Sequence, residues 1–217
     1  MDLNYLIKIF PLLLKGSIKT LELTIISVGF GTLIGIFIAL IKIQNNKILY
    51  FIGYLYTWLF RGTPLLLQII FIYFGVPSLS NNSIILTPTQ GALIALSLNS
   101  GAYMAEIIRG GILAVDKGQF EASKALGFTY LQTMRKVILP QTFKMILPAF
   151  SNEFITLLKD TSLVSTIAMV EIMRTAQVMY AASWSAEPYI GAAIVYLILT
   201  SVFTTMFGKF EKMAAKY

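Results

Sequence analysis

The sequence predicts an all-α membrane protein with five transmembrane helices. Of its 217 residues, 57% are hydrophobic and only 12% are charged, whereas charged residues make up about 25% of a typical soluble domain. The mean hydropathy is +0.76. Five stretches approach the roughly 20 apolar residues that a helix needs to cross a bilayer. These observations exclude a soluble protein and predict one membrane domain over residues 1–217.

The first predicted span covers residues 21–41. Gly31 and Gly35 within it form a small-xxx-small pair, which allows two helices to approach closely. Residues 3–20 precede this span and carry lysines, so we expect an interfacial amphipathic segment there.

Four further spans follow along the chain. The second is predicted over about residues 53–75 and contains a proline and an arginine. The remaining three are predicted over residues 89–108, 139–160 and 188–207. Residues 161–173 stay undecided, because a fairly apolar stretch of this length can either extend the fourth helix or re-enter the membrane.

The basic residues indicate how the chain is oriented. Residues 109–144 form the longest polar stretch and carry six bases against two acids. Basic loops stay on the cytoplasmic side, so alternation of the spans places the amino terminus outside and the carboxyl terminus in the cytoplasm. The uncharged loop at residues 78–88 fits an outside position, but the three lysines before residue 20 do not.

The composition limits the chemistry that the chain can perform. It has no Cys and no His, which removes disulfides, thiolate catalysis, the commonest zinc ligands and any Ser-His-Asp triad. We therefore expect no catalytic residue, no metal site and no cofactor bound by this chain. The net charge of +7 carries the orientation signal, and we expect no nucleic-acid partner.

A short helix followed by a glycine is the sharpest local signal. Residues 119–126 are predicted to form a helix with small side chains at Ala122, Ser123 and Ala125, and Gly127 is suited to end it. A short helix that projects from the membrane favours a docking role. An ordinary amphipathic loop helix fits the periodicity equally well.

This loop resembles the cytoplasmic signature of the membrane subunits of ATP-binding-cassette (ABC) importers: Glu-Ala-Ala, three residues, Gly, nine residues, and Ile-x-Leu-Pro. The matching positions are Glu121, Ala122, Gly127, Leu139 and Pro140, while Ser123 and Val137 are conservative departures. The chain is more specifically similar to the permeases for polar amino acids. The blocks that carry this similarity are residues 60–68, 101–106, 118–119, 139–141, 152–153 and 159–163.

The resemblance implies the type I ABC importer fold, with a coupling helix in the cytoplasmic loop at residues 109–138. It also implies a complex in the bacterial plasma (inner) membrane: two permease subunits, expected to be a homodimer, two cytoplasmic ATPases and an extracellular or periplasmic amino-acid-binding protein. The chain has no Gly-xxxx-Gly-Lys-Ser/Thr loop, so ATP and Mg are expected on the partner ATPase. The residues expected to contact the ATPase are Gln119, Glu121, Ala122, Ser123, Ala125, Leu126 and Gly127.

The fourth span carries two acids on one face. Glu153 and Asp160 are seven positions apart and lie within about 20° of each other on a helix, with Thr156 between them. Lys159 lies roughly 120° away from this stripe. A charge at the centre of a membrane helix costs about 2.5–3.5 kcal/mol on insertion scales, so such residues face protein or water. The net acidic stripe favours a cationic or zwitterionic substrate.

Polar residues of the second and third spans complete the predicted substrate-binding set. Asn99 and Tyr103 share a face of the third span with Glu106, and Ser100 lies beside it. Gln68 is a polar residue within the apolar second span, as Asn99 is within the third. Asn99 and Tyr103 are costly in lipid, which favours a position on a polar pathway.

We therefore expect an importer of polar amino acids, with a preference for the basic ones arginine, lysine and histidine, driven by ATP hydrolysis on a separate subunit. Two alternatives concern single residues: Asp160 could pair with Arg61 or Lys159, and Glu153 could bond to backbone. The main alternative function is a proton-coupled secondary carrier, because buried carboxylates also relay protons. A purely structural subunit of a membrane complex is a third possibility.

Overall fold

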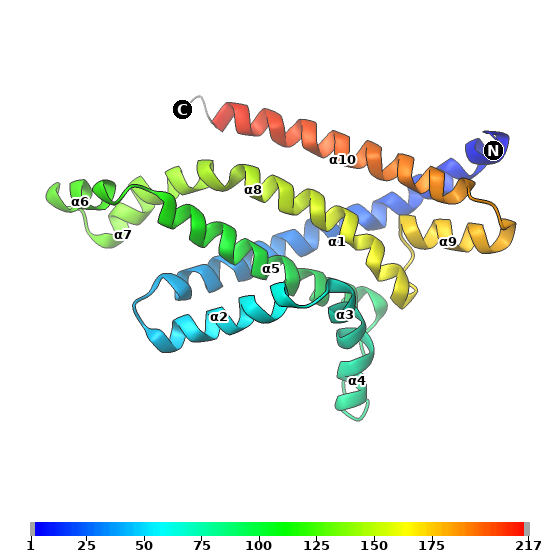
Figure 1. Ribbon diagram of the computed structural model, residues 1–217, viewed down its shortest axis with the longest axis horizontal. Coiled ribbons are helices and arrows are strands. Elements are labelled where there is room, and N and C mark those ends of the chain that lie inside the picture. Colours follow the sequence, from blue (N-terminus) through cyan, green and yellow to red (C-terminus); the bar gives the residue numbers. More distant parts are fainter. Residues whose placement is uncertain (1–2, 215–217) are drawn as a thin grey trace.

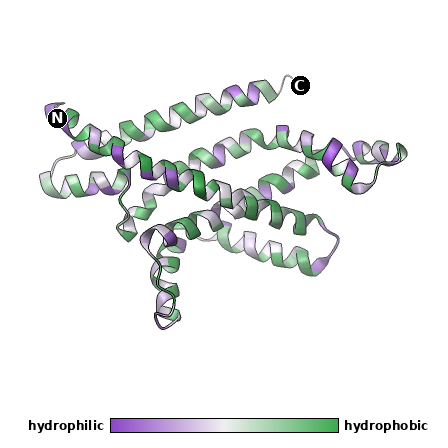
Figure 2. Cartoon of the chain, turned by 180° about the vertical axis from the view of Figure 1, so that it is seen from behind, coloured by the Kyte–Doolittle hydropathy of each residue, from purple (hydrophilic) through white to green (hydrophobic). Residues whose placement is uncertain are grey.

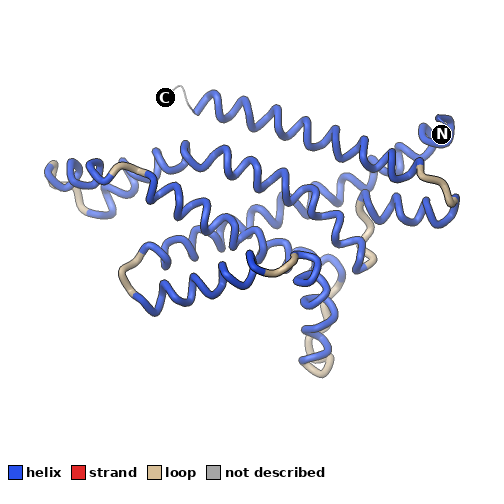
Figure 3. The backbone as a smooth tube through the Cα atoms, viewed as in Figure 1, coloured by secondary structure: helices blue, strands red, loops and turns tan. Residues whose placement is uncertain are grey.

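The computed structural model describes residues 3–214, and nearly all of them are helical (Figure 3). No strand occurs in this range. The elements in chain order (Figure 1) are α1 Leu3–Ile43, α2 Lys47–Gly62, α3 Leu65–Ile70, the π-helix η1 Phe71–Gly75, α4 Val76–Leu79, α5 Pro88–Ala114, α6 Lys117–Ala125, α7 Tyr130–Thr133, the π-helix η2 Met134–Ile138, α8 Leu139–Asp160, the 3-10 helix η3 Thr161–Ile167, α9 Ile172–Ser183 and α10 Glu187–Ala214.

The molecule is elongated, and its two ends differ. Helices α6 and α7 and the α1–α2 connection lie toward one end of the long axis, whereas the amino-terminal end of α1 and α9 lie at the other (Figure 1). Hydrophobic residues run along the long helices, and hydrophilic residues gather near α6 and α7 (Figure 2). This arrangement is typical of helices that cross a membrane, with a polar segment projecting from one side.

Helices α1, α5 and α10 are long and apolar enough to cross a membrane, and the bent pair of α2 with α3–α4 would make a fourth span. Helix α8 has 22 residues but contains Lys144, Glu153, Lys159 and Asp160. The predicted all-α membrane fold is confirmed. The number of five spans stays a prediction, because it depends on whether α8 crosses the bilayer.

The expected interfacial segment, residues 3–20, and the predicted first span belong to one helix, α1. It runs without a break for 41 residues, which is about 61 Å at 1.5 Å per residue. This is about twice the hydrocarbon thickness of a bilayer. Ile9 and Leu13 of its first half are buried in a cluster with Ile172 and Val195. The amino-terminal half is therefore held by packing against α9 and α10.

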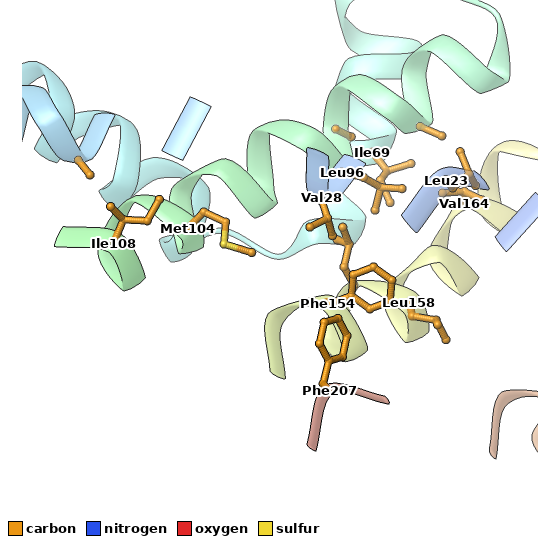
Figure 4. Packing of buried hydrophobic residues seen from close by; sticks show 14 of the residues in the cluster. Leu23, Val28, Ile69, Leu96, Met104, Ile108, Phe154, Leu158, Val164 and Phe207 are labelled. Atoms are coloured by element: carbon orange, nitrogen blue, oxygen red, sulfur yellow. The ribbon is translucent and has the colours of Figure 1, made fainter. Parts of the chain in front are cut away.

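The most extensive helix contact is between α1 and α5. A Cβ atom added at Gly31 would lie 2.8 Å from the Cβ of Ser100, and one added at Gly35 would lie 2.5 Å from the Cβ of Met104. The predicted small-xxx-small packing is confirmed. The core around this contact includes Leu23, Val28, Leu96, Met104, Phe154 and Leu158 (Figure 4).

The predicted second span, residues 53–75, is broken instead of straight. Helix α2 ends at Gly62, Thr63 and Pro64 have extended backbone, and α3 begins at Leu65. The axes on the two sides of the break differ by 103°. Pro64 has no N–H, so the carbonyl of Phe60, four residues earlier, loses its helical donor.

The undecided residues 161–173 form η3 and the turn into α9, a helix that the sequence did not predict. Glu171 is fully buried and caps α9. Its carboxylate accepts hydrogen bonds from the N–H groups of Met173 (2.9 Å) and Arg174 (2.7 Å) and from the hydroxyl of Tyr196 on α10 (2.8 Å). The turn is thus fixed to α10 by one side chain.

Candidate functional site

A polar cavity of about 490 Å³ lies between the α2–α3 break, α5 and α8. Five of the seven predicted substrate-binding residues line it. The complete lining is Thr63, Pro64, Leu65, Asn99, Tyr103, Ile107, Ala149, Asn152, Glu153, Thr156 and Asp160.

Helix α8 forms the acidic wall of this cavity. Glu153, Thr156 and Asp160 all line it, as the helical spacing predicts. Glu153 and Asp160 are half-buried and share one face of α8. Within residues 3–214, Asp160 forms no ion pair with Arg61 or Lys159. The alternative in which Asp160 holds helices together through such a pair is therefore not supported.

Helix α5 contributes two lining residues and one supporting residue. Asn99 and Tyr103 line the cavity, whereas Ser100 is fully buried beneath Gly31 of α1. Within residues 3–214, the buried hydroxyl of Ser100 has no hydrogen-bond partner. Ser100 therefore lies at the α1–α5 contact, next to the lining residue Asn99 in the chain.

Gln68, which was also expected at the substrate site, does not line this cavity. Its Nε2 donates to the carbonyl oxygen of Phe60 at 2.9 Å and to that of Thr63 at 3.1 Å. The Nδ2 of Asn99 donates to the same Phe60 carbonyl at 3.1 Å. These two amides replace the N–H that Pro64 lacks, so Gln68 stabilises the break at the cavity wall.

A second cavity, of about 440 Å³, adjoins α2 and the end of α5. Its charged lining residues are Lys42, Arg61, Glu106 and Arg109. The Nζ of buried Lys42 bonds to Glu106 and, at 2.9 Å, to the Oγ1 of Thr57, and Arg109 pairs with Glu106 at 2.7 Å. Three bases thus face one acid, and this cavity is net positive.

Helix α6 has the form predicted for a docking helix. Asp116 caps its first turn through a 2.6 Å bond from the N–H of Gly118. Gly127 ends it with φ +79°, and the N–H of Phe128 donates to the carbonyl of Ser123 at 3.0 Å, as in a Schellman motif. Among the predicted coupling residues, Ser123 is buried. The exposed ones are Gln119, Glu121, Ala122, Ala125, Leu126 and Gly127.

Sequence reasoning missed some of the cavity lining. Asn152 lies on the same helical stripe as Ala149 and Thr156, so the spacing of three and four residues could have identified it. Thr63 and Pro64 line the cavity because the chain breaks there, and Pro64 itself was the available signal.

Long apolar helices around a polar acidic cavity, with an exposed helix at one polar end, define a membrane permease that works with a partner. The chain belongs to the family of binding-protein-dependent transport system inner membrane components, whose profile matches residues 31–215. The family expected from the sequence is confirmed.

Relatives with assigned names agree with this membership. The chain is 42% identical to the arginine transport system permease protein ArtQ of Bacillus subtilis over 205 residues, which cover 94% of this chain and 93% of ArtQ. A relative in Rickettsia bellii carries the name of a glutamine transport system permease protein, GlnP. It is 41% identical over 213 residues, with 96% and 97% of the two chains covered.

Solved structures agree as well. An amino acid ABC transporter crystallised with histidines matches with a TM-score of 0.91 and 40% identity, covering 98% of this chain and 99% of that one. The MetNI methionine transporter in an inward-facing conformation shares the fold, with a TM-score of 0.78 at 21% identity and 99% of each chain covered.

The protein is therefore the permease subunit of an amino-acid ABC importer in the inner membrane. It is not an enzyme, and the ATPase is a separate subunit. This assignment removes the secondary carrier and the purely structural subunit as alternatives.

Proposed function

We propose that this permease carries basic amino acids, arginine, lysine and histidine, into the cytoplasm through the acidic cavity. Two carboxylates and no base on the cavity wall are the observation that supports this most directly. Glu153 and Asp160 would replace the hydration of a cationic side chain with charge-assisted hydrogen bonds. Thr156, Asn99 and Tyr103 would add polar contacts, and the volume of about 490 Å³ suits a small molecule.

The names of the relatives support amino acids as the substrate class, but they differ in the amino acid. The proposal for the individual substrate therefore depends on the residues of the cavity. One name specifies arginine, another specifies glutamine, and one structure was solved with histidines. A zwitterionic substrate such as glutamine also carries an ammonium group that an acidic wall attracts. The two carboxylates favour substrates that carry a second positive charge.

The proposed positions of the partner proteins follow from the difference between the two ends of the molecule. In the proposed orientation, α6 and the carboxyl terminus face the cytoplasm, and the amino terminus faces the binding protein outside. The ATPases, with ATP and Mg, would dock on the exposed face of α6, where Leu126 is 75% exposed. Two copies of this chain would form the translocation unit.

The test is uptake into liposomes that contain the complete transporter, with labelled arginine and glutamine supplied at saturating binding protein. We expect Glu153→Gln and Asp160→Asn each to lower arginine uptake by about tenfold or more, the usual cost of losing a charged hydrogen-bond partner. Glutamine uptake should fall less. Glu22→Gln is the matched control, because Glu22 pairs with Lys19 outside the cavity. Unchanged arginine uptake in both cavity variants would remove the carboxylates from the substrate site.

A further inference from the structure

Two cavities carry opposite charge, and Arg61 of one contacts Tyr103 of the other. The first cavity holds Glu153 and Asp160 without a base, and Tyr103 lines it. The second holds three bases and one acid, and Arg61 lines it. The guanidinium carbon of Arg61 lies 5.3 Å from the centre of the Tyr103 ring.

Arg61 differs from the other two bases of the second cavity. Lys42 and Arg109 share Glu106 as a partner. Arg61 forms no ion pair anywhere in residues 3–214, and its side chain is exposed. Stacking on an aromatic ring occupies the face of a guanidinium and leaves the five N–H donors at its edge available.

The α-carboxylate of an amino-acid substrate needs a partner away from the two acids of the cavity. Every α-amino acid carries a carboxylate at neutral pH, and this group cannot lie beside Glu153 and Asp160 without repulsion. The cavity wall itself offers no base. Arg61 adjoins the cavity through Tyr103, and it lies two residues before Thr63 on the cavity wall.

We propose that Arg61 receives the α-carboxylate of the substrate while the cationic side chain points toward Glu153 and Asp160. This inference rests on the proposed function and adds the orientation of the substrate to it. Tyr103 acts as a positioning residue that holds the plane of the guanidinium. The permease then selects α-amino acids with a free carboxylate over amines that carry the same side chain.

The test measures binding to the permease–ATPase complex in lipid nanodiscs without the binding protein. Labelled arginine is displaced by arginine, by agmatine, which has the same guanidinium chain without a carboxylate, and by arginine methyl ester. We expect the wild-type complex to prefer arginine to agmatine by about 10- to 100-fold, the range of a charge-assisted hydrogen bond. Arg61→Gln should abolish this preference and leave agmatine binding close to the wild-type value.

Arg174→Gln is the matched control, because Arg174 lies on α9 and lines neither cavity. It should keep the wild-type preference. An Arg61→Gln complex that prefers arginine as strongly as the wild type would overturn the proposal. So would equal wild-type affinities for arginine and its methyl ester, a result that needs no variant to fold.

The same assay separates this inference from the proposed function. Glu153→Gln and Asp160→Asn should weaken arginine and agmatine together and keep their ratio. If these variants leave both affinities unchanged, the carboxylates fail as the cation site. The ratio of arginine to agmatine affinity still decides the role of Arg61.

Discussion

The side-chain amide of Asn99 donates a hydrogen bond to the side-chain oxygen of Gln68 at 3.0 Å, and this bond joins α5 to the break after α2. Both residues also donate to the carbonyl oxygen of Phe60. Pro64 creates the need for these bonds because it cannot donate to that carbonyl. One wall of the acidic cavity is therefore shaped by a backbone group that two side chains satisfy.

Replacing Gln68 should destabilise the transporter. In Gln68→Leu, the Thr63 carbonyl loses its amide donor and Asn99 loses its acceptor, which we expect to cost about 1–3 kcal/mol. The midpoint of thermal unfolding of the purified complex measures this. Gln141→Leu is the control, because the amide of Gln141 donates to a nearby carbonyl, that of Val137 four residues earlier, at 2.9 Å. Equal midpoints for the two variants would contradict the role of Gln68.

The α1–α5 contact predicts opposite effects for two glycines of one helix. Gly35→Ala places a Cβ atom 2.5 Å from that of Met104, and such overpacking costs about 1–3 kcal/mol. Gly29 has nothing within 4 Å of the added atom, so Gly29→Ala should stabilise α1 by up to about 1 kcal/mol. Thermal unfolding of both variants gives the sign of each change. A stabilised Gly35→Ala protein would show that the helices do not pack this closely.

A substitution at the exposed end of α6 should lower the affinity for the ATPase and leave the stability of the permease unchanged. Burial of a leucine side chain contributes about 1.5–3 kcal/mol, so Leu126→Asp should weaken ATPase binding about tenfold or more and lower substrate-stimulated ATP hydrolysis. Leu126 is 75% exposed and Ile85, in the connection before α5, is 76% exposed. Ile85→Asp is therefore a matched control that should keep ATPase affinity. A titration of the ATPase with permease nanodiscs compares them, and equal affinities would remove α6 as the docking helix.

Glu171 should control the order of the turn before α9. Glu171→Ala removes the helix cap, which costs about 0.5–2 kcal/mol, and leaves the Tyr196 hydroxyl without its acceptor. Glu171→Gln keeps one acceptor oxygen and should lie between the wild type and the alanine variant. Hydrogen exchange of the α9 amides reports the change. Wild-type protection of α9 in Glu171→Ala would show that other contacts hold the turn.

The features that the sequence predicted well depend on local chemistry. Gly31 and Gly35 have the spacing of one helix face, and the structure packs that face closely. Gly127 adopts the left-handed conformation that ends α6. Helix α8 covers the residues predicted for the fourth span, 139–160, although the chain is already helical from Tyr130. In each case, the residues that carry the signal lie within a few positions of each other, even where the contact that they make joins distant segments, as between Gly35 and Met104.

The features that the sequence missed depend on contacts between distant segments. Gln68 was expected to face substrate, because polar groups in lipid are costly, and Asn99, which does line the cavity, was not expected to bond to backbone. Their partner is a carbonyl made available by Pro64, and only the folded chain shows that both amides reach it. Helix α9 was missed for a similar reason, because its cap at Glu171 is fixed by Tyr196 of α10.

Both carboxylates of the cavity lie beyond Pro148, the last proline of α8. The chain is helical without interruption from Tyr130 to Asp160, a length of about 45 Å. Movement at the α6–α7 end would therefore be transmitted along this continuous helix to Glu153 and Asp160. Because both residues lie after the prolines of α8, a bend at a proline would move the two carboxylates together. In the proposed cycle, the spacing of the two charges stays constant while the walls from α2 and α5 move. The cationic substrate would then cross the membrane beside two carboxylates at a fixed spacing. The side of the membrane from which the cavity is open would change during the cycle, while the affinity of the cavity for the cation would not.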